Sequence, residues 1–349
     1  MTAATEESTA SGAPVTPGLP LITFASIMRE PLPPIEWDVE GLIAHAERVL
    51  IYAEWGALKT WLGLDLGLHL GTGGKWLDEF TIPQARRVLY IDEEMNERTL
   101  RRRIKRLGAG MALATDDLPF RALSRFGVVF DDAGAARLLK ALHDAGFTPE
   151  VIIIDTYRRV NPGDENETKD VAKFWKRVEP ILKARITLIV IHHMRKPRSR
   201  NEGHRHRASG STDITAGADA TFALSRDQQD RNTIRVTCEK TREAEEVSPF
   251  IVTLRDDGDR DGPVVLQYGG TEKEFVAEGR KVADWIPAVE ELLRTQGTAS
   301  TGAILDALKA RGCPQRTGQR TLGVIGKGHE RIERVSRGVW RLKGEANAA

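Results

Sequence analysis

Cysteine is scarce in this chain, because its 349 residues include only Cys238 and Cys313. Two cysteines cannot build a disulfide framework, and this usage suits a reducing compartment. A net charge is nearly absent, because 51 Lys and Arg residues face 50 Asp and Glu residues. No overall field therefore draws the chain to nucleic acid or membrane, and any basic surface must be local.

Long hydrophobic runs are also missing, and the longest, such as 151–154 and 188–191, are far below the roughly 18 residues of a membrane helix. The first residues offer neither a basic region nor an apolar stretch of the kind that signal peptides need. We therefore expect a cytoplasmic protein that makes no use of a membrane.

Hydrophobic residues make up 40% of the chain and charged residues 29%, which is ordinary globular composition. The length favours two or more domains. Residues 1–20 are small and polar with Pro and Gly, and they predict a disordered tail. We assign 21–275 to one α/β domain and 281–343 to a small second domain.

Short apolar runs alternate with helical patterns in the first domain. The predicted strands are 48–53, 88–91, 151–154 and 188–191, and the predicted helices are 60–70, 96–107, 133–145 and 169–184. This alternation favours βαβ units and a mainly parallel sheet. Hairpin-like strands are expected at 220–225, 233–239 and 250–254, and a loop-rich stretch, 258–270, closes the domain.

The second domain shows three helical patterns followed by a β-hairpin. The first spans 282–293, the second begins at Ser300 or Thr301 and ends at Gly312, and the third covers 315–325. A hairpin at 331–342 follows, and the unit is basic on balance. Three helices and a hairpin in this order predict a winged helix, either DNA-binding or docking on a partner.

The segment after the first strand has the layout of a phosphate-binding loop. It reads Glu54, Trp55, Gly56, Ala57, Leu58, Lys59, Thr60 and Trp61, and it runs directly into a helix. In such a loop the backbone N–H groups cradle phosphates, a lysine reaches the β- and γ-phosphates, and a hydroxyl binds Mg²⁺. Ala53 and Leu58 stand where the usual motif has glycine, so an ordinary helix start with Lys and Thr is the alternative.

Carboxylates follow two of the predicted strands. One strand ends in Asp92, Glu93 and Glu94, and another ends in Asp155. The carboxyl ends of parallel strands converge on one crevice, where one carboxylate can hold Mg²⁺ and another can polarise an attacking water. Acids are favoured at a helix N-terminus in any case, so one of Glu93 and Glu94 is expected to serve only there.

The order of these motifs is more specific than any one of them. The segments are 155–159, 163–166, 190–196 and 209–213, followed by Ala218 and Asp219. Over roughly residues 21–255 the chain resembles the RecA-like AAA ATPases of plasmid and phage replication, the relatives of RepA-type hexameric helicases. The resemblance implies a RecA-like P-loop core, ATP and Mg²⁺ as cofactors, and a homo-oligomer, with a hexamer favoured.

The resemblance also implies roles for individual residues. Lys59 and Thr60 match the Walker A lysine and hydroxyl, and Asp155 matches the Walker B aspartate, which holds the metal through water. Glu94 is similar to the catalytic glutamate, and His193, more than His192, takes the sensor position. Lys240 and Arg242 match a pair that reaches the γ-phosphate of a neighbouring subunit, with ion pairs to Glu243 or Glu245 as the alternative.

Two basic regions are candidates for contact with DNA. The first is a loop with Arg195, Lys196, Arg198, Arg200, Arg205 and Arg207 against Glu202 alone. Its cations suit a single-stranded backbone. The second is the third helix of the C-terminal unit, which offers Arg316, Thr317, Gln319 and Arg320 to a duplex groove. His192, His193, His204 and His206 are disfavoured as a metal site, because neighbours on a strand face opposite sides.

These patterns predict an enzyme that hydrolyses ATP with Mg²⁺ at the subunit interfaces of a helicase-like DNA motor of a plasmid or phage. A helicase loader or a recombinase-like ATPase is the alternative within the enzyme class. A winged-helix regulator that binds nucleotide without turning it over is the alternative from another class.

Overall fold

The computed structural model describes residues 22–53, 56–113, 118–193, 213–227, 230–245, 247–256, 258–313, 315–326, 328–336 and 338–343. The side chains of 273–284, 315 and 316 are not described. The predicted tail and the basic loop around Arg195–Arg207 therefore lie outside the described residues. The chain forms two compact units, residues 1–35 and 36–349. The first contains helix α1 (Phe24–Arg29), whose N-cap Thr23 accepts the Ser26 N–H.

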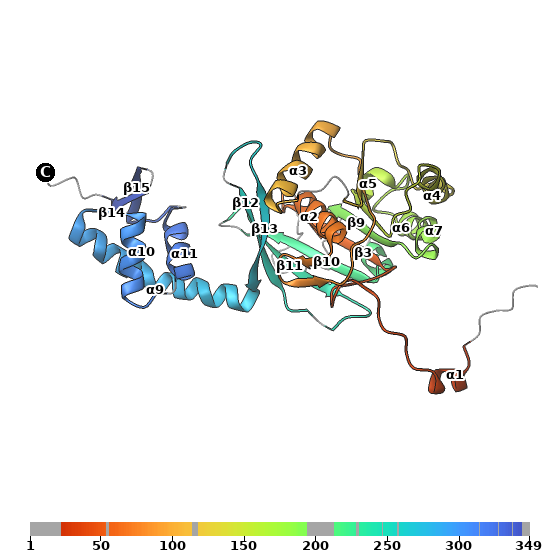
Figure 1. Ribbon diagram of the computed structural model, residues 1–349, viewed down its shortest axis with the longest axis horizontal. Coiled ribbons are helices and arrows are strands. Elements are labelled where there is room, and N and C mark those ends of the chain that lie inside the picture. The colour runs from red at the N-terminus through yellow and green to blue at the C-terminus, as the bar shows by residue number, and fades with distance from the viewer. Residues whose placement is uncertain are drawn as a thin grey trace, which may run out of the picture. The chain divides into compact units, whose positions relative to one another are not determined.

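A nine-stranded sheet forms the centre of the second unit (Figure 1), in the order β13-β12-β11-β10-β3-β9-β8-β6-β7. Six neighbouring strands run parallel: β10 (Ala220–Arg226), β3 (Arg48–Ala53), β9 (Thr187–His193), β8 (Val151–Asp155), β6 (Val88–Asp92) and β7 (Phe120–Ser124). The antiparallel side adds β11 (Thr233–Lys240), β12 (Phe250–Asp256) and β13 (Val264–Thr271). The predicted α/β fold with a mainly parallel sheet is confirmed.

Helices cover both faces of this sheet, because alternate residues of each buried strand point to opposite sides. One face packs on α2 (Lys59–Thr72) and α3 (Glu97–Gly110), and Val49 and Ile51 belong to that core. The other face packs on α4 (Gly134–Asp144), α5 (Tyr157–Val160), α6 (Thr168–Arg177) and α7 (Glu179–Lys183), and Leu50 and Tyr52 belong there. Helix α8 (Asp213–Gly217) precedes β10.

Helix α2 approaches the sheet closely through glycines spaced one turn apart. A Cβ atom on Gly63 would lie 2.6 Å from Ile191 Cδ1, and one on Gly67 would lie 3.1 Å from a ring carbon of Phe120. Side chains at i and i+4 share one face of a helix, so these glycines line the contact. The first turns of α2 are thereby held directly against β9 and β7.

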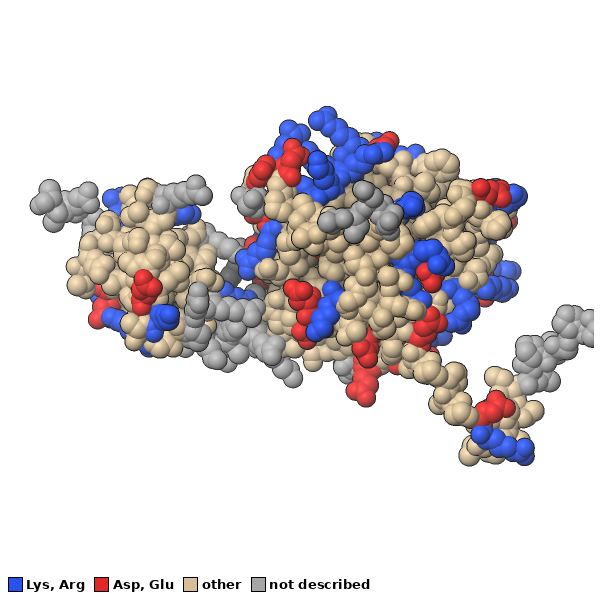
Figure 2. All heavy atoms as spheres, in the orientation of Figure 1, with Lys and Arg blue, Asp and Glu red and all other residues tan. Residues whose placement is uncertain are grey.

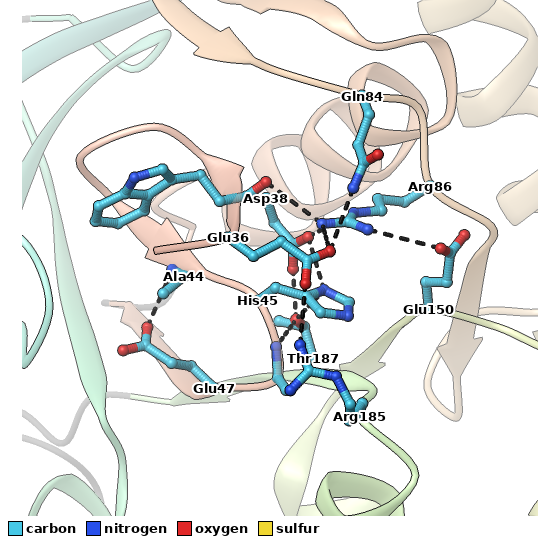
Figure 3. A network of polar contacts seen from close by, with 12 residues as sticks. Glu36, Asp38, Ala44, His45, Glu47, Gln84, Arg86, Glu150, Arg185 and Thr187 are labelled. Atoms are coloured by element: carbon cyan, nitrogen blue, oxygen red, sulfur yellow. Dashed lines mark hydrogen bonds and ion pairs between the residues drawn. The ribbon is translucent and has the colours of Figure 1, made fainter. Parts of the chain in front are cut away.

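A buried polar network fastens residues 36–47 to the amino-terminal ends of the parallel strands (Figure 3). This segment includes β1 (Trp37–Val39) and β2 (Ile43–Ala44). Arg86 Nε lies 2.7 Å from the fully buried Asp38, and Arg86 Nη2 lies 2.9 Å from Glu36. Thr187 donates to Asp38, while His45 Nδ1 lies 3.0 Å from Asp38 Oδ1.

Asp38, His45 and Thr187 do not form a catalytic triad. Asp38 and Thr187 both approach the same ring nitrogen of His45, at 3.0 and 3.5 Å. A triad needs the nucleophile on one nitrogen and the carboxylate on the other. The network therefore has a structural role, at the sheet edge opposite the phosphate-binding segment.

Several predicted elements differ in the structure. Two helices, α6 and α7, replace the single helix expected at 169–184, because Pro180 lacks an N–H and starts a new helix after Val178. Strand β13 occupies part of the stretch expected to be loop-rich, where it pairs with β12. Strand β7 and the hairpin of β4 (Gly74–Trp76) and β5 (Phe80–Ile82) were not predicted.

The C-terminal residues have a hydrophobic core of their own, which includes Val289, Leu293, Ile304, Ile325 and Trp340. The elements are α9 (Glu272–Gln296), β14 (Thr298–Ser300), α10 (Thr301–Ala310), α11 (Gln315–Gly326), β15 (Ile332–Ser336) and β16 (Val339–Leu342). The strands pair in the order β14-β16-β15. Helix α9 is longer than expected and runs through the predicted boundary at 275–281, and the division into two domains stays a prediction.

Candidate active site

The phosphate-binding segment leaves β3 at Ala53 and enters α2 at Lys59; Glu54 and Trp55 lie outside the described residues. Gly56 has φ +78°, and Leu58, the residue before the helix, has φ +55°. Leu58 therefore occupies the left-handed region that glycine adopts more easily, at a cost of about 1–2 kcal/mol. Ala57 is buried, and the side chain of the N-cap residue Leu58 makes no capping hydrogen bond. The N–H groups of the first turn of α2 suit an anionic ligand.

Asp155 lies at the end of β8, beside Lys59 and Thr60. Burial raises the pKa of Asp155, while the Thr60 hydroxyl and the Lys59 charge act in the opposite direction. Tyr90 donates its hydroxyl to Asp155 Oδ2 at 3.0 Å. Asp155 Oδ1 is buried without a hydrogen-bond partner among the described residues. One carboxylate oxygen near Lys59 and Thr60 is thus left for a further ligand.

Asp92 stands beside Asp155 in the register of β6 and β8. Its Oδ1 accepts the N–H groups of Glu94 and Met95 at 2.8 and 2.7 Å, while its buried Oδ2 has no partner in the described part of the chain. Burial raises the pKa of Asp92 to about 6. The buried Asp155 oxygen beside the Thr60 hydroxyl offers the hard oxygen donors that Mg²⁺ prefers. The residues present therefore fit a magnesium ion held by Thr60 and Asp155.

Glu93 and Glu94 follow one another but face different surroundings. Glu94 Oε1 lies 3.2 Å from Thr156 Oγ1 and 3.4 Å from His193 Nε2. The contact with His193 lowers the pKa of Glu94 to about 2, and the charge of Lys59 acts in the same direction. Glu93 instead accepts the N–H groups of Gly127 and Val128 at 3.1 and 2.9 Å. Geometry thus places Glu94 at the site and makes Glu93 a support for the loop after β7.

His192 and His193 point to opposite faces of β9, as alternation along a strand requires. His193 reaches Glu94 at the carboxyl edge of the sheet. His192 is fully buried, with its ring edge-on to Tyr157 at 4.9 Å between centroids. Of the two histidines, His193 therefore lies beside Glu94, and His192 packs in the core.

Lys240 and Arg242 lie near the opposite edge of the sheet. Lys240 pairs with Thr221 at the start of β10, whereas Leu224 further along β10 pairs with Ala53 at the phosphate-binding segment. Lys240 Nζ donates to the backbone oxygen of Ala216 at 3.0 Å. Arg242 Nη1 lies 3.1 Å from Asp219, a partner other than the Glu243 or Glu245 of the alternative interpretation. The fold does not bring this pair to the subunit's own phosphate site, so any role there requires a second subunit.

Only a few of the residues predicted to contact DNA lie within the described part of the chain. Gln319 of α11 is exposed and Arg320 is half-buried, while the side chain of Arg316 is not described. Thr317 is buried, with 5% of its surface exposed, and its backbone oxygen accepts the Thr321 hydroxyl. Thr317 therefore faces the core of its unit, and its expected place on a DNA-facing surface is wrong.

The sequence analysis did not identify three residues around the candidate active site, Tyr90, Arg103 and Arg226. Tyr90 holds Asp155, and its position two residues before Asp92, on the same side of β6, is a signal that could have identified it. Arg103 stacks over the Trp61 ring at 5.0 Å, a contact between two helices that no local pattern reveals. Arg226 Nη1 would lie 3.0 Å from a Cβ atom at Gly56, so the loop passes under a guanidinium from β10.

Comparison with known proteins identifies the family. A family model described as an AAA domain, AAA_25, matches residues 16–199, which is more than half of the chain. The chain therefore belongs to this family of AAA-domain proteins. None of the curated proteins searched matches it significantly in sequence.

Among solved structures, the chain is similar to that of a KaiC-like protein from the hyperthermophilic archaeon Pyrococcus horikoshii OT3. The identity is 14% and the TM-score is 0.45, over 66% of this chain and 93% of the other. No helix in the described residues has both the length and the apolar character needed to cross a membrane.

Proposed function

We propose that this chain hydrolyses ATP to ADP and phosphate with Mg²⁺, at a site built from Lys59, Thr60, Glu94 and Asp155. The observation that carries this proposal is the meeting of a lysine at a helix start, an orphaned buried carboxylate oxygen and an ionised glutamate at one sheet edge. When bound, Mg²⁺ would neutralise the negative charge of the phosphates, as it generally does in phosphoryl transfer.

The protein side chains divide the work between binding and orientation. Lys59 and the N–H groups of the first turn of α2 hold the phosphates. Glu94, with a pKa of about 2, stays ionised at neutral pH and accepts a hydrogen bond from the attacking water. So low a pKa favours an orienting role over a strongly basic one. His193, 3.4 Å from Glu94, is placed to report the state of this group to the segment after β9.

The finer part of the proposal is a helicase-like DNA motor of a plasmid or phage, working as a homo-oligomer, with a hexamer favoured. The oligomer is supported by Lys240 and Arg242, which lie away from the subunit's own phosphate site. Contact with DNA is supported by the cations at 195–207 and on α11. The C-terminal element order supports a winged helix in the same assembly. A helicase loader, a recombinase-like ATPase and a regulator without turnover are the alternatives.

Three single substitutions separate these roles. Lys59→Ala should lose ATP binding, because the phosphates lose their cation. Glu94→Gln should bind ATP yet release phosphate about 10²-fold more slowly or worse, because water is no longer oriented. Glu93→Gln is the matched control, since the Glu93 side chain contacts the loop after β7 and not Thr156 or His193, and it should keep near-normal turnover. Binding is measured by calorimetry and turnover by phosphate release.

The proposal fails if Glu94→Gln turns ATP over at the wild-type rate. Tight ATP binding with no hydrolysis by the wild-type chain, with and without DNA, would instead favour the nucleotide-binding regulator.

A further inference from the structure

Helix α3 carries a row of cations beside the candidate active site. Arg98, Arg102 and Lys105 follow one stripe of the helix at i, i+4 and i+7, and all are exposed or partly exposed. Arg103 lies next to this stripe, and the exposed Arg260 comes from the segment between β12 and β13. We call these five residues the α3 basic face. Figure 2 shows Lys and Arg side chains gathered over the position that α3 takes in Figure 1.

Cations outnumber carboxylates on the α3 basic face. Glu97 pairs with Arg101 at 2.6 Å and Asp256 pairs with Arg106 at 2.8 Å, so Asp261 is the one carboxylate among the described residues that line the two hollows. Within the described part of the chain, none of the five members makes a hydrogen bond or an ion pair with another side chain. Like charges this close repel one another, and an anionic ligand would relieve that repulsion.

The α3 basic face is also hollowed, and the Trp61 ring packs against one of its arginines. Trp61, Arg102, Arg103 and Arg260 line a hollow of about 290 Å³, and a second hollow of about 280 Å³ continues along Arg98 and Lys105. The Arg103 guanidinium is held over the Trp61 ring at 5.0 Å, and burial lowers its pKa. A partly dehydrated cation fixed on an aromatic ring is a prepared anion partner, unlike a solvated surface lysine.

The spacing of the cations selects the kind of anion. From Arg98 to Lys105 the helix rises roughly 10 Å, which is longer than a single phosphate group, so the row suits several phosphates in line. Guanidinium groups pair well with phosphate oxygens. The described lining residues are mostly Arg and Lys, and they include no Asn or Gln that could pair with an adenine edge. The surface therefore suits a phosphate backbone, independent of base sequence.

We propose that the α3 basic face binds the phosphodiester backbone of a nucleic-acid strand. This site is distinct from the loop at 195–207 and from α11. It does not depend on ATP hydrolysis, and it is tested without nucleotide.

The experiment compares two triple variants of the full chain. Arg98→Gln, Arg102→Gln and Lys105→Gln together remove three charges from α3. Lys169→Gln, Lys173→Gln and Lys176→Gln remove three charges from α6, where the lysines are exposed at the same i, i+4, i+7 spacing. Binding to a fluorescent oligothymidylate and to a duplex of equal length is followed by anisotropy at several salt concentrations. Inorganic tripolyphosphate serves as competitor, and circular dichroism checks that both variants are folded.

The α3 variant should weaken oligonucleotide binding at least about tenfold and reduce the salt slope by about two units, because each single-strand phosphate contact contributes ~0.7. The α6 control should stay within about twofold of wild type, and Lys59→Ala should bind like wild type. The proposal is overturned if the α3 variant binds both oligonucleotides as the control does. It is also overturned if only tripolyphosphate, and neither oligonucleotide, binds in a manner that depends on α3.

Discussion

Single carboxyl groups show how strongly the surroundings set chemistry in this molecule. Glu93 and Glu94 are neighbours with the same side chain, yet one supports a loop through two N–H groups and the other contacts His193 and Thr156. From the sequence alone, either glutamate could be the one that only stabilises the N-terminus of the following helix. Their separation depends on β7 and on the end of β9, which no local pattern around residue 93 contains.

Glu47, at the amino-terminal edge of the sheet, gives a prediction about pH and stability. Burial raises the pKa of Glu47 to about 7, although the Ala44 N–H that it accepts at 3.2 Å opposes this rise. An unfolded glutamate titrates near pH 4.3. Between these values the folded chain binds a proton that the unfolded chain lacks, so the free energy of unfolding should decrease as pH rises. Asp92, with a pKa of about 6, acts in the same direction.

Glu47→Gln should therefore reduce the loss of stability between about pH 5 and pH 8 and should raise stability at the upper end. Urea unfolding at several pH values measures this, with the exposed Glu79→Gln as control. A Glu47→Gln profile that falls as steeply as the wild-type profile would refute the prediction.

At the scale of elements, the strands around the site were predictable and the outer ones were not. The runs at 88–91, 151–154 and 188–191 are short, β-branched and buried on both faces, so each predicts a strand by itself. Strand β13 contains Gly269 and Gly270, which locally favour a loop, but the close contact of Gly269 with Ile251 leaves room only for a small residue. Long-range pairing overrode local preference there.

The end of α3 tests the packing of this unpredicted strand. A Cβ atom on Gly110 would lie 2.0 Å from the Val264 backbone oxygen, whereas one on Gly108 would find its nearest atom, on Leu113, at 4.0 Å. Gly110→Ala should destabilise the protein by about 1–3 kcal/mol, because backbone must move. Gly108→Ala should be neutral or stabilising by up to about 1 kcal/mol through helix propensity. Chemical denaturation compares them, and equal stabilities would show that β13 does not pack on α3 in this way.

At the scale of the whole molecule, the sequence predicted which strands bring Lys59, Glu94, Asp155 and His193 together, because strand ends in a parallel sheet share one edge. It could not predict the contacts of Arg242, which pairs with Asp219 beside Arg48. Those contacts depend on β10 and β11 meeting at the opposite edge. The role proposed for Arg242 is at the phosphate site of a neighbouring subunit, which the structure of a single chain does not contain.

The measurement that tests the central claim most directly is ATP hydrolysis by mixed subunits. If the site is shared, Arg242→Ala and Lys59→Ala should each be inactive alone, the first while still binding ATP. Mixing them should restore part of the activity, because some interfaces then join an intact Lys59 site to an intact Arg242. Phosphate release is measured on mixtures whose co-assembly is verified by mass. Activity in the mixture is the result that this account predicts, and full activity of Arg242→Ala alone, or no rescue in verified mixed oligomers, would contradict it.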